Sequence, residues 1–209
     1  MEEAHEELLN VYDATGAVVD TRPRREAKAS GLAVGAVNVL LANAAREVLL
    51  QRRPVDRENG GRWDKSVGGH VSAGESFDQT AVRETGEELF DDASCPLVRL
   101  AGDEGAYRDL LTGGAPRDGV VFRRAALRLN LRDVRLAPGG GLKNVLYHVA
   151  IYRGRTDLPL EAFRPQASEI AGLRYFAPEA VDSMLLAGEL APNMSFLWLT
   201  EAQALLAEG

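Results

Sequence analysis

The most constraining feature of this sequence is a glycine pair followed by one strong helix pattern. Gly68 and Gly69 precede a helix pattern that begins near Ser76. Ser76 and Gln79 have the spacing of a capping box, in which a hydroxyl and an amide side chain satisfy backbone groups at the helix start. Gly86, inside the helix, costs about 1 kcal/mol relative to alanine and therefore predicts a close packing partner or a compensating tertiary contact.

Three glutamates lie on one face of the predicted helix. Glu84, Glu87 and Glu88 stand at positions i, i+3 and i+4, so their side chains project together. Like charges at this spacing repel by about 0.2–0.5 kcal/mol per pair, and a bare helix gains nothing from them. Their oxygens would instead hold a hard divalent cation such as Mg²⁺ or Mn²⁺. The helix alone leaves two interpretations open, a cation site and a solvated acidic face.

The neighbouring charges and one glycine extend this pattern. Gly69, five residues, Glu75, seven residues and the pair 83–84 are followed by the pair 87–88. This spacing resembles the signature of the Nudix hydrolases, G-x5-E-x7-R-E-U-x-E-E-x-G-U, where U is an apolar residue. The resemblance implies an α/β/α sandwich on a mixed β-sheet, an α+β fold. It also implies a pyrophosphohydrolase, in which water attacks a diphosphate linkage of a nucleoside diphosphate derivative or a related small molecule.

The resemblance assigns a role to each residue of this pattern, which we call the box. The three box glutamates would ligate Mg²⁺, or Mn²⁺ as a substitute, together with a backbone carbonyl near Gly68 or Gly69. Gly69, Glu75 and Arg83 would be structural, with the two charged residues orienting the loop and the helix. Bound divalent ions neutralise diphosphate oxygens and acidify the attacking water.

A glutamate must then accept the proton of the attacking water. In the family that the resemblance indicates, this base is a box glutamate or one from a distant loop. Glu169, just before a predicted strand, is the candidate from outside the box, and a plain surface glutamate is the alternative. The predicted catalytic set is therefore Glu84, Glu87, Glu88 and Glu169.

Four cationic side chains flank the box and could bind an outer phosphate. Two of them end the strand before the box and two precede the glycine pair; they are Arg52, Arg53, Arg62 and Lys65. We expect at least one of the four to contact substrate, and for each alone a solvated side chain is the alternative. Trp63, at a junction between loop and strand, is expected to fill the core rather than to stack on a base.

Three positions depart from the signature. Thr85 and Asp91 stand where apolar residues are usual, and Phe90 replaces the final glycine. Without that glycine the helix lacks the usual left-handed cap, so we expect its end to shift towards Asp92 or Ser94.

The rest of the chain alternates strands with a few helices. Apolar runs predict one hairpin from 8–12 and 17–19, and a second from 36–42 and 48–51. Further strands are predicted at 134–137 and 145–152 around a turn at 138–141, and at 169–176. Residues 122–129 fit a strand or one short helix. Helices are predicted from Pro178 and over 196–206.

The length and composition bound the organisation of the molecule. We expect one domain over 1–209, with 1–30 as an N-terminal hairpin extension and 102–141 as an insertion that carries substrate specificity. The single cysteine, Cys95, excludes an internal disulfide. No run approaches the ~18 apolar residues of a bilayer span, and the first residues are acidic where a secretory signal is basic. These observations predict a cytoplasmic protein without a membrane partner.

The charge balance restricts the partners. A formal net charge of -7 argues against a nucleic acid polymer, which a basic surface would have to bind. A small-molecule diphosphate held through a metal remains compatible with this charge. The resemblance leaves a homodimer open.

Residues 63–70 and the N-terminal strand pair are also similar to the Nudix branch that includes isopentenyl-diphosphate isomerases. Those enzymes need a cysteine where this chain has Gly68 and a metal-binding histidine where it has Val34, and His70 alone is retained. Isomerase activity is therefore the weaker alternative. A catalytically inactive ligand-binding protein is another, against which the intact glutamates argue.

Overall fold

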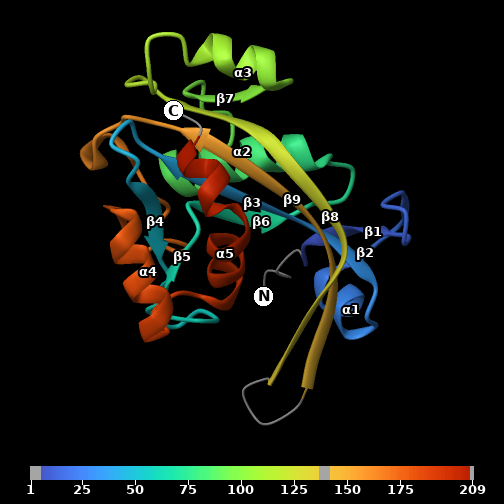
Figure 1. Cartoon of the computed structure of the whole chain (residues 1–209). Helices are drawn as coiled ribbons and strands as arrows, with labels where there is room; N and C mark the ends of the chain where they lie inside the picture. Colours follow the sequence, from blue (N-terminus) through green and yellow to red (C-terminus); the bar gives the residue numbers. More distant parts are fainter. Residues whose placement is uncertain (1–5, 137–141, 208–209) are drawn as a thin grey trace.

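A mixed ten-stranded sheet organises the computed structural model, which describes residues 6–136 and 142–207 (Figure 1). Its main path runs β10-β4-β3-β9-β8-β7, with β6 and the β1–β2 hairpin joined to β3, and β5 joined to β4. Two strand pairs, β3 with β9 and β7 with β8, are parallel, and the others are antiparallel. The strands are β1 Leu8–Tyr12, β2 Val18–Pro23, β3 Ala33–Ala42, β4 Val48–Arg52, β5 Trp63–Asp64, β6 Val67–His70, β7 Val98–Ala101, β8 Val120–Leu136, β9 Leu142–Arg155 and β10 Gly172–Phe176.

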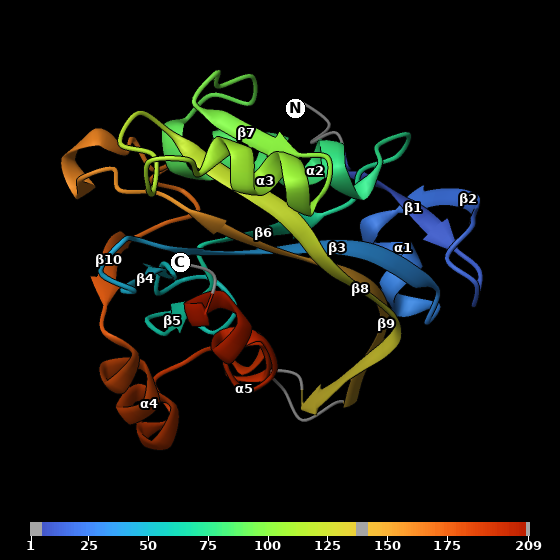
Figure 2. The same cartoon turned by 45° about the horizontal axis from the view of Figure 1, so that its top comes forward.

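Helices cover both faces of this sheet (Figures 1 and 2). Successive side chains of a strand point to opposite faces. On β3, Val39 and Leu41 pack in the cluster that contains α2 Phe77–Phe90, whereas Leu40 and Ala42 pack towards α4 Pro178–Ala187 and α5 Pro192–Ala207. Since both faces are buried, β3 is apolar almost throughout rather than alternating. The predicted α/β/α sandwich with a mixed sheet is confirmed.

The N-terminal hairpin forms as predicted and lies at one end of the sheet (Figure 2). β1 pairs with β2 and also with β3, where Val11 is opposite Val34. A short helix that the sequence did not predict, α1 Arg24–Ala29, follows β2. Its Ala27 is buried in a small cluster with Leu9 and Val34. This packing fixes α1 against the edge of the sheet.

The segment from Gly102 to Leu136 contains α3 Glu104–Leu110 and the long strand β8. Residues 122–129 belong to β8, so the strand interpretation was right and the helix was not. β8 pairs with β9 from Val121 to Leu136, with irregularities after Arg124 and Arg128. The predicted turn at 138–141 lies outside the described residues, and the strands predicted on either side of it are both longer than expected. That 102–141 is an insertion stays a prediction.

The predicted start of α2 is confirmed, and its predicted end is wrong. At the start, Ser76 and Gln79 form the predicted capping box. At the end, the expected shift towards Asp92 or Ser94 is wrong, because α2 stops at Phe90 and Asp91 takes the left-handed conformation with φ 55°. Aspartate tolerates this conformation better than most residues, so no glycine is needed.

The remaining predictions differ only at their boundaries. The strand predicted at 169–176 begins at Gly172, and the last helix begins at Pro192 rather than near residue 196. In the part of the chain that the structure describes, no helix combines the length and apolarity that crossing a membrane requires.

Candidate functional site

The site begins where β6 passes the middle of α2. A Cβ atom on Gly69 would lie 2.1 Å from both Cδ and Oε1 of Glu84. The missing side chain at position 69 therefore makes the space in which the Glu84 carboxylate lies over the strand backbone. This contact gives the first glycine of the box a physical reason.

Arg83 connects the charged residues of the box. Its Nε and Nη2 donate to the two oxygens of Glu75 at 2.8 and 2.9 Å, and its Nη1 donates to Glu87 Oε2 at 2.8 Å and to Glu84 Oε1 at 3.1 Å. Thr80 Oγ1 also donates to Glu75 at 2.7 Å. The hydrogen bonds from Arg83 lower the pKa of Glu75, and those to Glu75 raise the pKa of Arg83. The structure thus brings Gly69, Glu75 and Arg83 together with the box glutamates.

Glu88 is buried beneath this network. Its Oε2 accepts a hydrogen bond of 3.0 Å from Gln51 Nε2 and one of 3.4 Å from the backbone N–H of Gly68. Burial, followed by the charge of Glu84, raises the pKa of Glu88 to about 8. Burial likewise raises the pKa of Glu84 to about 7, although Arg83 opposes the shift. Burial therefore disfavours the charged form of both carboxyls, and a nearby cation would favour it.

The chemistry of this donor set fits a hard divalent ion, because desolvated carboxylates beside an open glycine backbone are oxygen ligands without competing bulk. As the side chains stand, no three His, Cys, Asp or Glu groups within the described ranges converge closely enough to hold a metal. Glu84 and Glu87 are turned towards Arg83, and Glu88 towards Gln51. The ligand assignment therefore stays a prediction.

Lys65 and Arg53 are the two predicted cations that contact Asp64. Lys65 is 7% exposed, and its Nζ lies 3.4 Å from both carboxylate oxygens of Asp64. A Cβ on Gly68 would lie 2.0 Å from Lys65 Cε, so the lysine fills the space beside that glycine. The charge of Lys65 lowers the pKa of Glu88. Arg53 Nη1 donates to Asp64 at 3.0 Å, which holds Asp64 between two cations.

Arg52 and Arg62 contact the surrounding loops. The Arg52 guanidinium lies 5.9 Å from the centre of the Trp63 ring, and Arg62 Nη1 donates to the Leu190 carbonyl at 3.2 Å. Trp63 packs edge-on against Phe176 at 4.7 Å and joins the core cluster of α4 and α5. The expectation that Trp63 fills the core is confirmed.

Glu169 lies in a turn, not at the start of a strand. Its Oε1 is 2.7 Å from Arg57 Nη2, and its side chain is 40% exposed. The same loop is joined to α2, because the N–H of Gln166 donates to the carbonyl of Glu88 at 3.2 Å. The fold thus ties the Glu169 loop to the end of the box helix.

Sequence reasoning missed three residues that support the site: Gln51, Arg57 and Asp64. Gln51 binds Glu88, Arg57 binds Glu169, and Asp64 binds Lys65 and Arg53. A signal for Gln51 was present, since it is a polar residue at the end of an apolar strand. Arg57 lies in a charged loop and Asp64 ends the two-residue strand β5, and no local pattern distinguishes either of them.

Comparisons with known proteins agree with this geometry. A family model described as the NUDIX domain matches residues 32–196. A Pseudomonas aeruginosa protein named as an uncharacterised Nudix hydrolase, PA4841, is 30% identical over 174 residues, which cover 83% of this chain and 80% of that protein. The crystal structure of DR0079 from Deinococcus radiodurans has a TM-score of 0.61 at 21% identity, covering 92% of this chain and 98% of that chain. The NUDIX domain of Shewanella oneidensis NrtR, solved with ADP-ribose, has a TM-score of 0.50 at 15% identity and covers 83% of this chain and 88% of that chain.

Proposed function

The chain belongs to the Nudix hydrolase family, and on that premise we propose that it is a Mg²⁺-dependent hydrolase that cleaves a diphosphate linkage by water attack. Its activity as a pyrophosphohydrolase follows from the family. The metal and the substrate class, a nucleoside diphosphate derivative or a related small molecule, are our proposal.

The observation that carries the proposal is the placement of Glu84 in the space left by Gly69, with Glu88 buried behind Gly68. Two desolvated carboxyls and one half-exposed carboxyl, Glu87, project from the same side of α2. Glu84, Glu87 and Glu88 would hold Mg²⁺ or Mn²⁺, which would neutralise the diphosphate oxygens and promote attack by water.

The other side chains would prepare the site. Arg83, held by both oxygens of Glu75, sets the orientation of the box helix relative to the preceding loop. Lys65 is the predicted cation best placed to bind a phosphate, because it lies beside Gly68 and acts electrostatically on Glu88.

A carboxylate must also accept the proton of the attacking water. The candidates are a box glutamate, of which Glu84 is tested first, and Glu169 on the loop joined to the end of α2. Glu84→Gln and Glu169→Gln separate them, since loss of the base depresses kcat most at high pH. The variant that retains the wild-type pH profile of kcat is not the base.

The function is tested with a panel of nucleoside di- and triphosphates, dinucleotides, nucleotide sugars, prenyl diphosphates and ADP-ribose, each with Mg²⁺ and with Mn²⁺. ADP-ribose is included because the NrtR domain was solved with it. We expect at least one compound to be cleaved at its diphosphate bond, with both products identified. No cleavage by the wild type, combined with ligand-induced shifts of the melting temperature, would identify a ligand-binding protein instead.

An isomerase is the less favoured alternative. Gly68 has no thiol, and Val34 is fully buried between β1 and β9, where it pairs with Val11 and Tyr147. Neither position offers the proton-transfer group or the ligand that isomerisation would need. We expect no conversion of isopentenyl to dimethylallyl diphosphate.

The proposed partners are small molecules. We propose a cytoplasmic protein that binds no nucleic acid polymer, as the net charge of -7 indicates. A homodimer stays a prediction, which size-exclusion chromatography with light scattering tests.

A further inference from the structure

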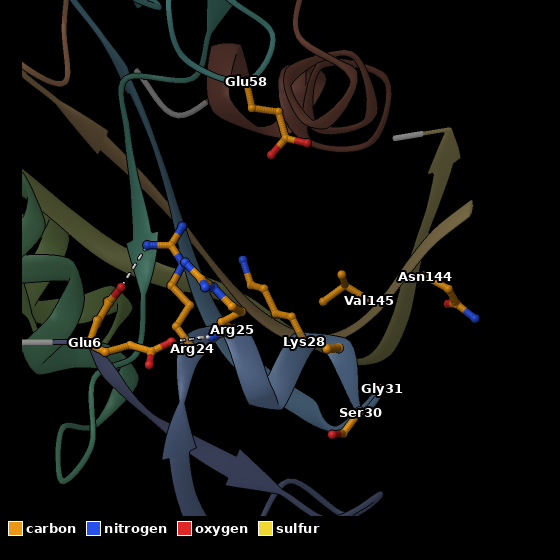
Figure 3. Close-up of a pocket in the computed structure, with 11 residues that line it drawn as sticks. Glu6, Arg24, Arg25, Lys28, Ser30, Gly31, Glu58, Asn144 and Val145 are labelled. Atoms are coloured by element: carbon orange, nitrogen blue, oxygen red, sulfur yellow. Dashed lines mark hydrogen bonds and ion pairs between the residues drawn. The ribbon is translucent and has the colours of Figure 1, made fainter. Parts of the chain in front are cut away.

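A cavity of about 890 Å³ opens between α1 and the loop that carries Glu58. Figure 3 shows Arg24, Arg25 and Lys28 projecting from α1 on one side of this space and Glu58 on the other. A volume of this size accommodates a nucleotide-sized ligand, because ligand pockets commonly measure ~300–1,000 Å³. It is larger than a bare diphosphate needs.

The cavity lies next to the box. Glu7 lines it, and is close enough to Glu84 for its charge to contribute to the raised pKa of that carboxyl. His70 of β6 and Tyr147 of β9 lie on two strands that both pair with β3, and their ring centres are 6.1 Å apart. Lys28 Nζ lies 5.6 Å from the centre of the Tyr147 ring. A ligand whose diphosphate sits at the box can therefore extend towards α1.

The helix that bears the three cations is fixed in position. Ala27 is fully buried and packs with Val34 and Val145, whereas Arg24 and Arg25 are exposed and Lys28 is half-buried. The match to the NUDIX family model begins at residue 32, so α1 lies outside it. The three cationic side chains, which form the α1 wall of the cavity, thus lie outside the matched range.

The charges of this wall suit a phosphate. Arg24 Nη1 is 2.8 Å from Glu7, but the two side chains are 47% and 35% exposed, and such a pair contributes little. Within residues 6–136 and 142–207, no group forms a hydrogen bond or ion pair with the Arg25 guanidinium. A guanidinium presents paired donors that match phosphate oxygens, and a phosphomonoester carries more charge than the carboxylate it would displace.

We propose that Arg24, Arg25 and Lys28 bind a phosphate group of the substrate that lies outside the diphosphate bond being cleaved. The inference deepens the proposed function and rests on it. The substrate class is a nucleotide that contains a diphosphate and carries an additional phosphomonoester. The cavity at α1 selects such compounds over otherwise identical ones without that group.

Two pairs of probes differ by one such phosphate: NADPH with NADH, and coenzyme A with its 3′-dephospho form. Their dissociation constants are measured by calorimetry in EDTA, so no turnover occurs. For at least one pair, we expect the wild type to bind the phosphorylated member about tenfold more tightly, as the loss of one charge-assisted contact predicts. In R25A/K28A this preference should fall close to unity.

Two further variants act as controls. Arg22→Ala removes an arginine of β2 that pairs with Asp20 and does not line the cavity, so the preference should persist. R25K/K28R keeps both charges and should retain most of the preference. Melting temperatures close to that of the wild type would show that each variant is folded.

The outcomes separate this inference from the proposed function. Equal binding of both members of each pair by the wild type, or an unchanged preference in R25A/K28A, overturns the inference. A preference that depends on Arg25 and Lys28, in a protein that hydrolyses no diphosphate with Mg²⁺, supports the α1 site and contradicts only the hydrolase. Hydrolysis without any preference contradicts only the α1 site.

Discussion

Arg83 binds both carboxylate oxygens of Glu75, with Nε 2.8 Å from Oε1 and Nη2 2.9 Å from Oε2. Glu75 lies in the loop before α2, and Arg83 lies in the middle of that helix. The remaining guanidinium nitrogen reaches Glu84 and Glu87. One side chain thus joins the loop to the helix and positions two of the proposed metal ligands, which explains why the box contains both charges.

Arg83→Lys keeps the charge but loses the guanidinium group that binds both carboxylate oxygens of Glu75. We expect a loss of about 2 kcal/mol in the free energy of unfolding, because hydrogen bonds to charged groups are broken. Turnover should fall as well, since Glu84 and Glu87 lose a common partner. Urea denaturation gives the stability, and Arg99→Lys is the control, because the exposed pair of Arg99 with Asp118 should contribute less than about 1 kcal/mol. Equal stability of Arg83→Lys and wild type would contradict the role of Arg83 in joining the loop to α2.

Gly69→Ala tests the space that Glu84 occupies. The new methyl group would lie 2.1 Å from Glu84 Cδ, the end of a flexible side chain, so Glu84 must move while the backbone stays in place. We expect a folded protein whose turnover falls by about two orders of magnitude, as for misplaced catalytic groups in general. Gly172→Ala, at a site with nothing within 4 Å, should be active. Full activity of Gly69→Ala would show that the position of Glu84 does not matter.

Glu88→Gln removes a proposed ligand and a buried titrating group together. With Mg²⁺, turnover should fall by orders of magnitude while the fold is kept. Without metal and at high pH, the same substitution should instead increase the stability of the fold. The pKa of Glu88 is about 8 in the folded chain against 4.5 ordinarily, so between these values the folded state binds more protons than the unfolded state. The free energy of unfolding therefore decreases as pH rises through this window.

In EDTA, Glu88→Gln should thus melt above the wild type near pH 8 and close to it near pH 5. Adding Mg²⁺ near pH 8 should raise the melting temperature of the wild type and not that of the variant. Glu179→Gln, at an exposed position of α4, serves as the control. If wild type and Glu88→Gln lose stability in parallel between these pH values, the buried carboxyl is not the group that titrates.

The sequence separation of the interacting residues determined how much of this site could be predicted from the sequence. The capping box of Ser76 and Gln79, and the common face of the three glutamates, depend on spacings of three or four residues, which a helix fixes by itself. The partner of Glu88 did not follow from any such spacing, because Gln51 is 37 positions away and meets it only through the sheet.

The errors have physical causes as well. The predicted end of α2 was wrong because Asp91 adopts the left-handed conformation, which the prediction assumed to require glycine. The short helix α1 was missed because only Ala27 of its six residues is buried, which leaves no apolar periodicity to detect. A short, charged helix such as α1 can be identified as part of a possible binding site only from the structure, in which the N-terminal hairpin places it near the box.

Gly86→Ala tests the close approach that ends α2. In an unobstructed helix, alanine would be favoured over glycine by about 1 kcal/mol. Here the added Cβ would lie 2.2 Å from the backbone oxygen of Asp92, and the N–H of Asp92 donates to the Gly86 carbonyl at 3.1 Å. Backbone on both sides cannot yield as a side chain can, so we expect a net loss of about 2 kcal/mol in the free energy of unfolding.

Gly105 in α3 provides the matched helical control for this prediction. Its added Cβ would meet only Oδ1 of Asp103, the N-cap of α3, at 3.3 Å, and a shift of a few tenths of an ångström would relieve this contact. Gly105→Ala should therefore be neutral or stabilising by up to about 1 kcal/mol, in line with helix propensity. Urea denaturation of both variants decides the matter. If Gly86→Ala were as stable as Gly105→Ala, the turn through Asp91 could move at no cost, and the glycine would have no packing role.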